Sequence, residues 1–397
     1  MTAFACAATA QGKNLLFYGN SFSSRNGTVA NMVQLIALEA GHLVPTIVKR
    51  FAGGQNLNYH ATNPGQVGAI SNSLPSGQQW DYVILQGQST EATQTLGNPS
   101  LFRNSALNIT SNVRNHSPLA KAVLYQTWAR ATQHHYYPNT FATPIAMHDE
   151  IRGNYKSAAA DINNALGADT ANNSAAGDGV GLLEWDPSYY EPDMYHPLPS
   201  MTLLASMCIY SSVYGERACA IHPDFNSASP LVNWLASLGL GAGDWQELAP
   251  LADRSSSPTL RPFPGSGDHL LLESATMPSP LSACGKLNIG QGTYLTIRLT
   301  SMNQVFDGVP SLLLGTAFAT GSYPTASPLW PELHIDTSNM FVLSTTPNLN
   351  PEQIWFTQLP FTIPGVSVMV QGLAWGASSE TGNPNFTTTD AHTFEFQ

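Results

Sequence analysis

The sequence predicts an α/β domain with a mostly parallel five-stranded sheet in a three-layer α/β/α arrangement, followed by a C-terminal all-β sandwich domain. Two observations support this fold class. Between residue 14 and about residue 215, short apolar runs alternate with longer helical patterns across short connections, which favours right-handed crossovers and a parallel sheet covered on both faces. After about residue 257 the pattern changes to short β-rich runs separated by Pro, Gly and Asn, which is typical of a sandwich.

The first part of the chain is expected to contain five strands and five helices. The strands are expected at residues 15–19, 43–51, 81–87, 121–129 and 179–185, and the helices at residues 28–41, 64–73, 101–116, 143–166 and 197–215. This order predicts a flavodoxin-like arrangement, in which ligands bind beyond the carboxyl ends of the strands, near the switch in strand order. The residues just after each strand are therefore the first candidates for a site.

The remaining segments indicate where the chain divides. Residues 1–13 are expected to form an N-terminal tail whose small residues resemble the end of a signal peptide, residues 14–220 the α/β domain, and residues 221–256 a helical and linker segment. Residues 257–397 are expected to form the sandwich, with β runs at 293–301, 310–319, 340–346, 353–363, 366–377 and 392–396.

The composition limits the compartment and the partners. Of the 397 residues, 43% are hydrophobic but only 10% are charged, and the formal net charge is -11. An average soluble domain has about 25% charged residues, so this surface must be polar through Asn, Ser, Thr, Gln and Gly, which suits a secreted, extracellular or periplasmic protein. An acidic excess without a basic run argues against nucleic acid and anionic membranes as partners. The sequence contains no run of about 18 apolar residues, so no membrane span is predicted. The sequence leaves the oligomeric state open.

The four cysteines suggest disulfides rather than a metal site. Cys208 and Cys219 lie close together in sequence, so a bridge between them is expected if the protein is secreted, and Cys6 with Cys284 could form a second one. Four thiols remain the alternative. No cysteine or histidine spacing typical of zinc occurs, so neither a metal nor another cofactor is implied.

The stretch "NLLFYGNSFSS" places a serine, Ser21, directly after the first predicted strand. Gly-Asn and Asn-Ser are common turn dipeptides, so a turn or helix cap is the simpler interpretation. A serine on a tight strand-to-helix turn, however, exposes its hydroxyl at the carboxyl edge of the sheet, where helix N-terminal N–H groups can stabilise an oxyanion. Such a nucleophile needs a base and a residue that orients the base.

The loop after the fifth predicted strand supplies both. It contains Asp193 and His196, and a carboxylate three residues before a histidine can reach the imidazole Nδ1–H and leave Nε2 to face a serine on a neighbouring strand end. Ser21, Asp193 and His196 thus form a candidate catalytic triad. Ser89 is a distant second candidate nucleophile, and Ser23 is read as a cap or turn residue.

With these residues the pattern resembles the SGNH or GDSL-like hydrolase superfamily of esterases and lipases, over about residues 14 to 215. "YGNSFS" is similar to its first motif, with Asn20 where Asp is commoner, and "DMYHPLPS" is similar to its last. The resemblance implies that Ser21 is the nucleophile, His196 the general base and Asp193 its orienting residue. It also implies an oxyanion hole built from the N–H groups of Ser21 and of Gly54 or Gly53.

The third oxyanion donor departs from the family pattern. No Gly-x-Asn-Asp follows the third predicted strand, and the available amides are Gln86 and Gln88. We prefer Gln88, because it lies just past the strand and a Gln amide can donate as Asn does. Three further residues, Asn20, Trp128 and His134, are candidates for substrate contacts, although packing and an exposed loop are the ordinary roles of Trp128 and His134.

The function expected from these residues is hydrolysis of carboxylic esters through an acyl-enzyme, without a cofactor. The low charge and the appended sandwich favour an extracellular enzyme that acts on an acylated carbohydrate or another ester polymer. Transfer of the acyl group to a sugar is an enzymatic alternative. A different class is a non-catalytic carbohydrate- or polymer-binding protein on a degenerate hydrolase scaffold, for which the missing third-motif Asn is the one hint.

Overall fold

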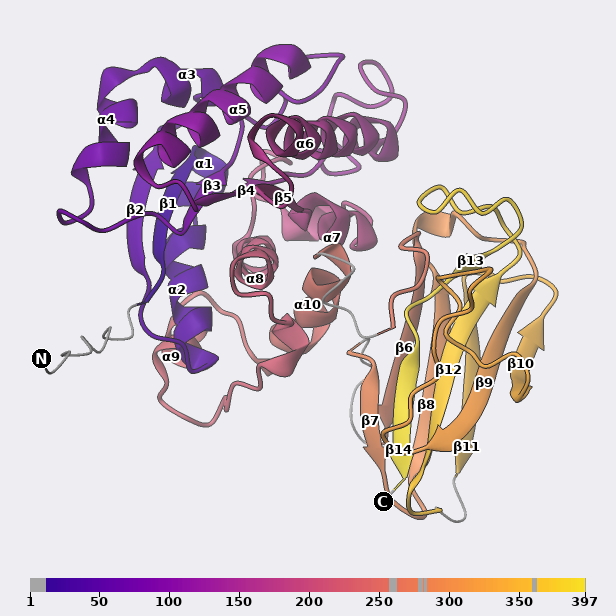
Figure 1. Cartoon of the computed structure of the whole chain (residues 1–397). Helices are drawn as coiled ribbons and strands as arrows, with labels where there is room; N and C mark the ends of the chain where they lie inside the picture. Colours follow the sequence, from indigo (N-terminus) through magenta and orange to yellow (C-terminus); the bar gives the residue numbers. More distant parts are fainter. Residues whose placement is uncertain (1–11, 257–262, 278–280, 282–283, 359–362, 397) are drawn as a thin grey trace, which may run out of the picture. The chain divides into compact units, whose positions relative to one another are not determined.

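The computed structural model describes residues 12–256, 263–277, 281, 284–358 and 363–396. The chain divides into two compact units, shown in Figure 1. The first, here called the α/β unit, comprises Met1–Leu248 and Ser255–Ser257, and the second, called the β unit, comprises Ala249–Arg254 and Pro258–Gln397.

The α/β unit contains a five-stranded sheet in which all neighbouring strands run parallel. Its strands are β1 (Asn14–Gly19), β2 (Thr46–Phe51), β3 (Tyr82–Leu85), β4 (Lys121–Tyr125) and β5 (Ala171–Ser174), in the order β2-β1-β3-β4-β5. This confirms the predicted parallel sheet and its flavodoxin-like order. The strand order switches between β1 and β3, so the carboxyl ends of these two strands are where a ligand site is expected.

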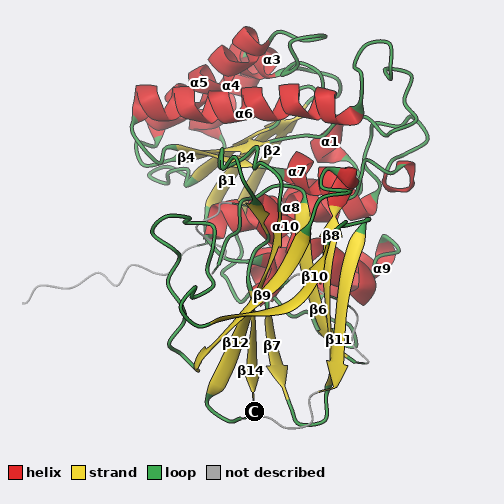
Figure 2. Cartoon of the chain, turned by 90° about the vertical axis from the view of Figure 1, so that its right-hand side faces the viewer, coloured by secondary structure: helices red, strands yellow, loops and turns green. Residues whose placement is uncertain are grey.

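Helices cover both faces of this sheet (Figures 1 and 2). On one face lie α3 (Leu57–Thr62), α4 (Pro64–Asn72), α5 (Pro99–His116) and α6 (Pro144–Leu166), and on the other lie α2 (Val29–Glu39), α7 (Ala176–Leu182) and α8 (Pro199–Tyr214). A single turn, α1 (Ser21–Ser24), follows β1, and α9 (Pro230–Ser237) and α10 (Ala242–Ser255) follow α8. None of the helices in the described part of the chain is long and apolar enough to cross a membrane.

Burial of the central strand explains its sequence. Every residue of β1 is buried, and Leu15 and Leu16 are fully inaccessible. A parallel strand covered by helices on both faces reads as a continuous apolar run rather than an alternating one. The run therefore holds the turn that follows it at a fixed place on the sheet edge.

The fifth strand was placed wrongly by the sequence pattern. The run at 179–185 lies largely in the short helix α7, and the strand is the preceding, mostly polar segment β5. A short apolar run can be a buried strand or a buried helix. In this segment a glycine allows the helix to pack closely on its neighbour. A Cβ atom on Gly177 would lie 2.2 Å from the Thr127 carbonyl oxygen, so this helix packs directly on backbone. The second strand also starts later than expected, at Thr46, and α3 was not expected at all.

The β unit contains two sheets. A six-stranded sheet runs β10 (Met340–Thr346), β9 (Ser311–Ala319), β12 (Val366–Ala374), β14 (His392–Phe396) and β7 (Lys286–Ile289), with β13 (Thr387–Thr388) paired to β12. A three-stranded sheet runs β11 (Glu352–Gln358), β8 (Tyr294–Ser301) and β6 (Leu270–Thr276). Side chains from both sheets share one core, for example Leu299 of β8 and Val370 of β12, which confirms the predicted sandwich, although β6, β7 and β13 were not expected.

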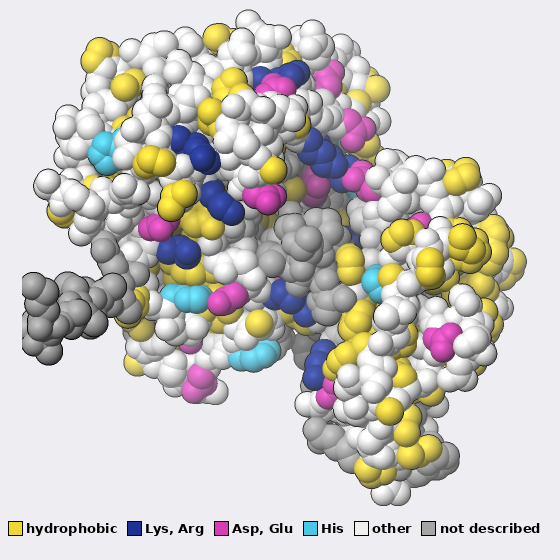
Figure 3. All heavy atoms as spheres, viewed as in Figure 1, with side chains coloured by type: hydrophobic (Ala, Val, Ile, Leu, Met, Phe, Trp, Pro, Cys, Tyr) yellow, Lys and Arg dark blue, Asp and Glu magenta, His cyan; other side chains and the backbone are white. Residues whose placement is uncertain are grey.

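Hydrophobic side chains also lie on the outside of the β unit, where Figure 3 shows them in yellow on the visible face. Among them are Tyr294, Ile354 and Phe356 of the three-stranded sheet and Met340, Phe341 and Val342 of β10. Trp330 and Trp375 are exposed as well, whereas Trp355 packs against the core.

The cysteine prediction is wrong for one pair. Cys208 carries a buried thiol, and Cys219 and Cys284 each take part in a disulfide, so the expected Cys208–Cys219 bridge does not form. Cys6, most of the tail at 1–13 and the first residues of the expected sandwich segment, 257–262, lie outside the described residues.

Candidate active site

The turn after β1 is built to present Ser21. Asn20 precedes α1 as its N-cap, and its side-chain oxygen accepts a hydrogen bond from Phe22 N at 3.1 Å. Gln86, fully buried at the end of β3, accepts hydrogen bonds from Asn20 N and from the Ser23 hydroxyl, both at 2.9 Å. The turn is therefore fixed to the neighbouring strand on both sides of Ser21, whose own N–H stands at a helix start, without an intrahelical acceptor.

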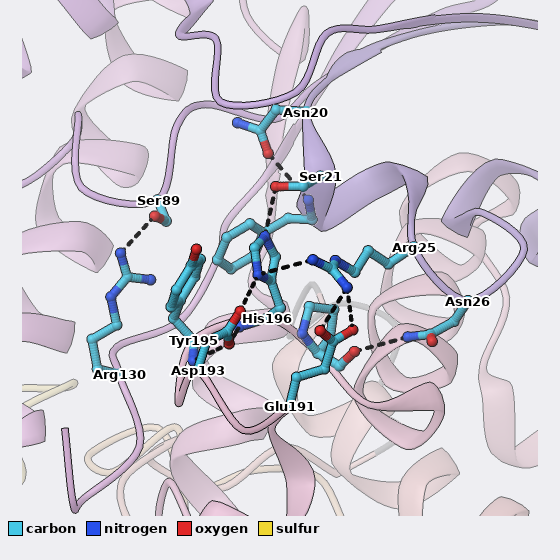
Figure 4. A network of polar contacts seen from close by, with 12 residues as sticks. Asn20, Ser21, Arg25, Asn26, Ser89, Arg130, Glu191, Asp193, Tyr195 and His196 are labelled. Atoms are coloured by element: carbon cyan, nitrogen blue, oxygen red, sulfur yellow. Dashed lines mark hydrogen bonds and ion pairs between the residues drawn. The ribbon is translucent and has the colours of Figure 1, made fainter.

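The three predicted triad residues lie together (Figure 4). The Ser21 hydroxyl is 2.8 Å from His196 Nε2, and His196 Nδ1 is 2.6 Å from Asp193 Oδ2. His196 is buried, with 7% of its surface exposed, and its ring packs against Phe22 and Tyr195. The imidazole is thus held between a hydroxyl that it can deprotonate and a carboxylate that fixes its orientation.

A tight loop supports this histidine. Asp193 Oδ1 accepts hydrogen bonds from the backbone N–H groups of Tyr195 and His196 at 3.1 and 3.0 Å, and Met194, directly after Asp193, has a positive φ of 64°. Burial alone would raise the pKa of Asp193, but the hydrogen bonds from His196 and from these two N–H groups lower it below its ordinary value. The orienting carboxyl is therefore ionised at neutral pH.

Residues just past Ser21 hold the same loop, and the sequence did not single them out. Arg25 contacts both carboxylate oxygens of Glu191 at 2.6 and 2.7 Å and lies 3.4 Å from His196 Nδ1. Asn26 donates to the carbonyl of Pro197 at 2.9 Å. Figure 4 shows both side chains reaching from the nucleophile's segment to the histidine's loop. These contacts fix the two halves of the triad relative to each other.

Gly54 and Gln88, two of the predicted oxyanion donors, line one cavity, while Gly53 belongs to the same turn after β2. Gly54 has a φ of +69°, and nothing would touch a Cβ atom there. The Gln88 side-chain oxygen accepts from the N–H and hydroxyl of Thr90, both at 2.8 Å, which leaves the amide nitrogen as its donor. Gln86, in contrast, uses its oxygen to hold the nucleophile turn.

The predicted substrate contacts do not fit the burial of their residues. Trp128 is fully buried and donates to the carbonyl of Tyr195 at 3.2 Å, so it supports the triad loop from behind. Asn20 is 1% exposed and its amide is used inside the protein. His134 is 8% exposed and its ring packs against His135, and burial together with the nearby Arg130 and His135 lowers its pKa to about 4. All three side chains are therefore buried in the protein and not open to a substrate.

The rival serines are engaged elsewhere. Ser23 donates to Gln86, and Ser89 is 3% exposed and accepts from Arg130 at 2.9 Å. Arg130 is itself buried, and its guanidinium lies 4.6 Å from the centre of the Tyr195 ring. The sequence analysis did not select Arg130. Its one signal was that it is a single arginine in the segment after the fourth strand, in a chain with few charged residues.

One cluster among the described residues has the spacing of metal ligands, namely Glu191, Asp193 and His196, whose ligand atoms all lie within 4.8 Å of one another. Each of these atoms already has a protein partner, because Glu191 pairs with Arg25 and Asp193 with His196. The cluster is therefore explained as a triad with an ion pair beside it.

Comparison with known proteins gives structural neighbours only. No protein-family profile matches the chain, and no curated protein sequence matches it. Solved structures similar to about half of the chain include a candidate SGNH hydrolase from Slackia heliotrinireducens, at 19% identity and a TM-score of 0.40, covering 51% of this chain and 98% of that one. A candidate GDSL-like lipase from Parabacteroides merdae has 18% identity and a TM-score of 0.38, covering 52% and 96%. A carbohydrate esterase family 3 enzyme from Talaromyces cellulolyticus has 12% identity and a TM-score of 0.38, covering 51% and 97%.

Proposed function

We propose that the protein is a serine esterase that hydrolyses carboxylic esters through an acyl-enzyme. The observation that carries this proposal is the continuous line of contacts from Ser21 through His196 to Asp193, at 2.8 and 2.6 Å. A serine hydroxyl is a weak nucleophile unless a base removes its proton, and an oriented imidazole is the base that most often does so.

The reaction follows from this geometry. His196 Nε2 takes the proton of Ser21 as Oγ bonds to the ester carbonyl carbon, and the N–H groups of Ser21 and Gly54 with the Gln88 amide stabilise the oxyanion. The carbon–oxygen bond to the alcohol then breaks, and His196 returns its proton to the departing alcohol oxygen. A water molecule then gives a proton to His196 and attacks the acyl carbon. The bond to Ser21 Oγ breaks, the acid is released, and His196 returns the proton to Ser21.

The substrate we propose is an acylated carbohydrate or another ester polymer outside the cell. The low charge, with 10% charged residues, and a separate β unit with exposed aromatic side chains support this choice. The same two features suit an enzyme that works on a large, hydrated and largely uncharged substrate.

Replacement of the nucleophile tests the proposal. Ser21→Ala should lower kcat on p-nitrophenyl acetate by about 10⁴-fold or more, and a fluorophosphonate should label Ser21 alone. Ser24→Ala is the matched control, because Ser24 lies in the same helical turn but is exposed. This control should keep full activity and labelling.

Two results would count against the assignment. Labelling of Ser23 or Ser89, or full activity in Ser21→Ala, would show that the triad is not the catalytic group. A wild-type protein that turns over no ester and takes up no fluorophosphonate would favour the non-catalytic binding protein instead.

A further inference from the structure

A cavity of about 270 Å³ lies in the α/β unit beside the predicted oxyanion donors. Its walls come from the turn after β2, including Gly54 and Asn56, from the segment after β3, including Gln88 and Glu91, and from the start of α5 at Asn98. Both β2 and β3 neighbour β1, so the cavity lies beside the point where the strand order switches.

Asn20 connects this cavity to the nucleophile. Its side-chain nitrogen donates to the carbonyls of Gln55 at 3.0 Å and Gly87 at 3.4 Å. These two residues directly adjoin the cavity residues Gly54, Asn56 and Gln88, and Asn20 itself directly precedes Ser21. The turn that carries Ser21 is therefore hydrogen-bonded to two of the segments that form the cavity wall.

Of the four amide residues that line the cavity, three have side-chain oxygens that already accept hydrogen bonds inside the protein. Asn56 Oδ1 caps α3 by accepting from Tyr59 N at 3.0 Å, and Asn98 Oδ1 caps α5 by accepting from Leu101 N at 3.0 Å. The Gln88 oxygen is bonded to Thr90. A ligand is therefore offered amide N–H groups, which are hydrogen-bond donors.

A raised pKa favours the neutral form of the one carboxyl group in the lining. Glu91 is its only ionisable residue, and no Lys or Arg is among the described residues that line it. Both Glu91 oxygens lie near Leu57 N, at 3.1 and 3.3 Å. Burial raises the pKa of Glu91 to about 8, against the opposing effect of the N–H groups of Leu57 and Gln88.

Beside the polar residues Asn58 and Thr90, the lining has an apolar part, and the volume of the cavity is small. Leu96 and Leu101 are exposed at 43% and 38% and line the cavity with the buried ring of Phe102. Pockets for drug-sized molecules have volumes of about 300 to 1,000 Å³, so this one has room for a single ring. A pyranose fits such surroundings, because it has hydroxyl oxygens at its edge and C–H groups on its face.

We propose that this cavity binds one uncharged sugar ring, with Asn56, Gln88 and Asn98 donating hydrogen bonds to its hydroxyl oxygens and the leucines contacting its apolar face. The proposal deepens the proposed function and rests on it only in that the ring would carry, or adjoin, the ester attacked by Ser21. Sugar binding itself does not depend on catalysis.

The experiment measures binding of methyl β-glucopyranoside and methyl β-xylopyranoside to the intact protein, by calorimetry or ligand-detected NMR. The double variant Asn56→Ser/Asn98→Ser keeps a good helix cap at both positions but removes the amide donors. We expect at least one sugar to bind, and the double variant to weaken that binding about tenfold, as loss of two hydrogen bonds should.

Asn63→Ser is the matched control, because Asn63 caps α4 through Gly65 N and Gln66 N and does not line the cavity. It should bind the sugars like the wild type. Absence of binding by both sugars, equal affinity in the double variant and the control, or tighter binding of methyl glucuronoside than of methyl glucoside would overturn the proposal. Turnover of p-nitrophenyl acetate by the wild type, measured separately, shows whether the esterase function stands when the cavity proposal fails.

Discussion

At the scale of single residues, the site depends on a few charges in an otherwise uncharged environment. Arg25 and Glu191 form an ion pair that is partly exposed, so its contribution to the free energy of unfolding is small. Its position matters more, because it joins the segment of Ser21 to the loop of His196. Glu91 is the opposite case, a carboxyl group in the cavity wall that no cation accompanies among the described lining residues.

Glu91 predicts a pH-dependent stability. Its pKa is raised from 4.5 to about 8 in the folded protein, so between these pH values the folded state binds more protons than the unfolded state and the free energy of unfolding falls as pH rises. Glu91→Gln removes this loss. Thermal unfolding at pH 5 and pH 8 should show the variant gaining on the wild type by a few kcal/mol at the higher pH. A difference that is the same at both pH values would show that Glu91 is ionised throughout.

The proximity of Ser21, Asp193 and His196 could be predicted from the sequence because their signals are local. Ser21 follows an apolar strand, and Asp193 precedes His196 by three residues on one loop. Arg25 and Glu191 carry no such signal, since 166 positions separate them and only the folded sheet edge brings them together. The burial of the Trp128 and His134 side chains could not be predicted from the sequence either, which is why both were expected to contact substrate.

At the scale of elements, the short helix α7 shows how closely backbone can pack beside the site. Gly177 N donates to the carbonyl of Gln126 at 3.2 Å, and a Cβ atom on this glycine would lie 2.2 Å from the Thr127 carbonyl oxygen. Trp128, which supports the triad loop, comes next in the chain. The helix therefore packs against the backbone that leads into the site.

Two glycine replacements in helices should have opposite effects. Gly177→Ala should lower the free energy of unfolding of the α/β unit by roughly 1 to 3 kcal/mol, because the backbone must move apart to admit the methyl group. Gly153→Ala, at an exposed position of α6 where nothing lies within 4 Å, should raise it by about 0.5 to 1 kcal/mol, because alanine favours the helix. Thermal or urea unfolding checks both, and equal effects would refute the close packing of α7.

Some helices and strands could be predicted from the sequence pattern, and others could not. The long helices α5, α6 and α8 were recognised within two residues at each end, because an apolar pattern over four or more turns, a Pro near the start and a polar or Gly residue at the end agree with one another. The fifth strand has the polar sequence "ANNS". This segment is a strand because it pairs with β4 at the edge of the sheet. Such pairing depends on the tertiary structure and cannot be read from a four-residue segment.

At the scale of the whole molecule, the residues of the proposed chemistry all lie in the α/β unit, and the β unit needs another role. Its three-stranded sheet exposes Tyr294 and Phe356 at 42% and 56%, and their rings stack at 5.5 Å and 11° between planes. Large exposed apolar side chains that group together mark interaction sites more often than chance. Under the proposed function, this flat aromatic pair is the surface expected to contact a polymer that carries the ester.

The double variant Tyr294→Ala/Phe356→Ala tests this role. It should lower binding to, and deacylation of, an insoluble acetylated polysaccharide by about tenfold, in line with roughly 0.5 to 1.5 kcal/mol from aromatic contacts, while kcat/KM on p-nitrophenyl acetate stays the same. Leu119→Ala, which removes an 83% exposed side chain from the α/β unit, is the control and should change neither. If the aromatic variant loses activity equally on both substrates while its unfolding is unaltered, the β unit is part of the catalytic architecture and does not serve as a separate polymer-binding unit.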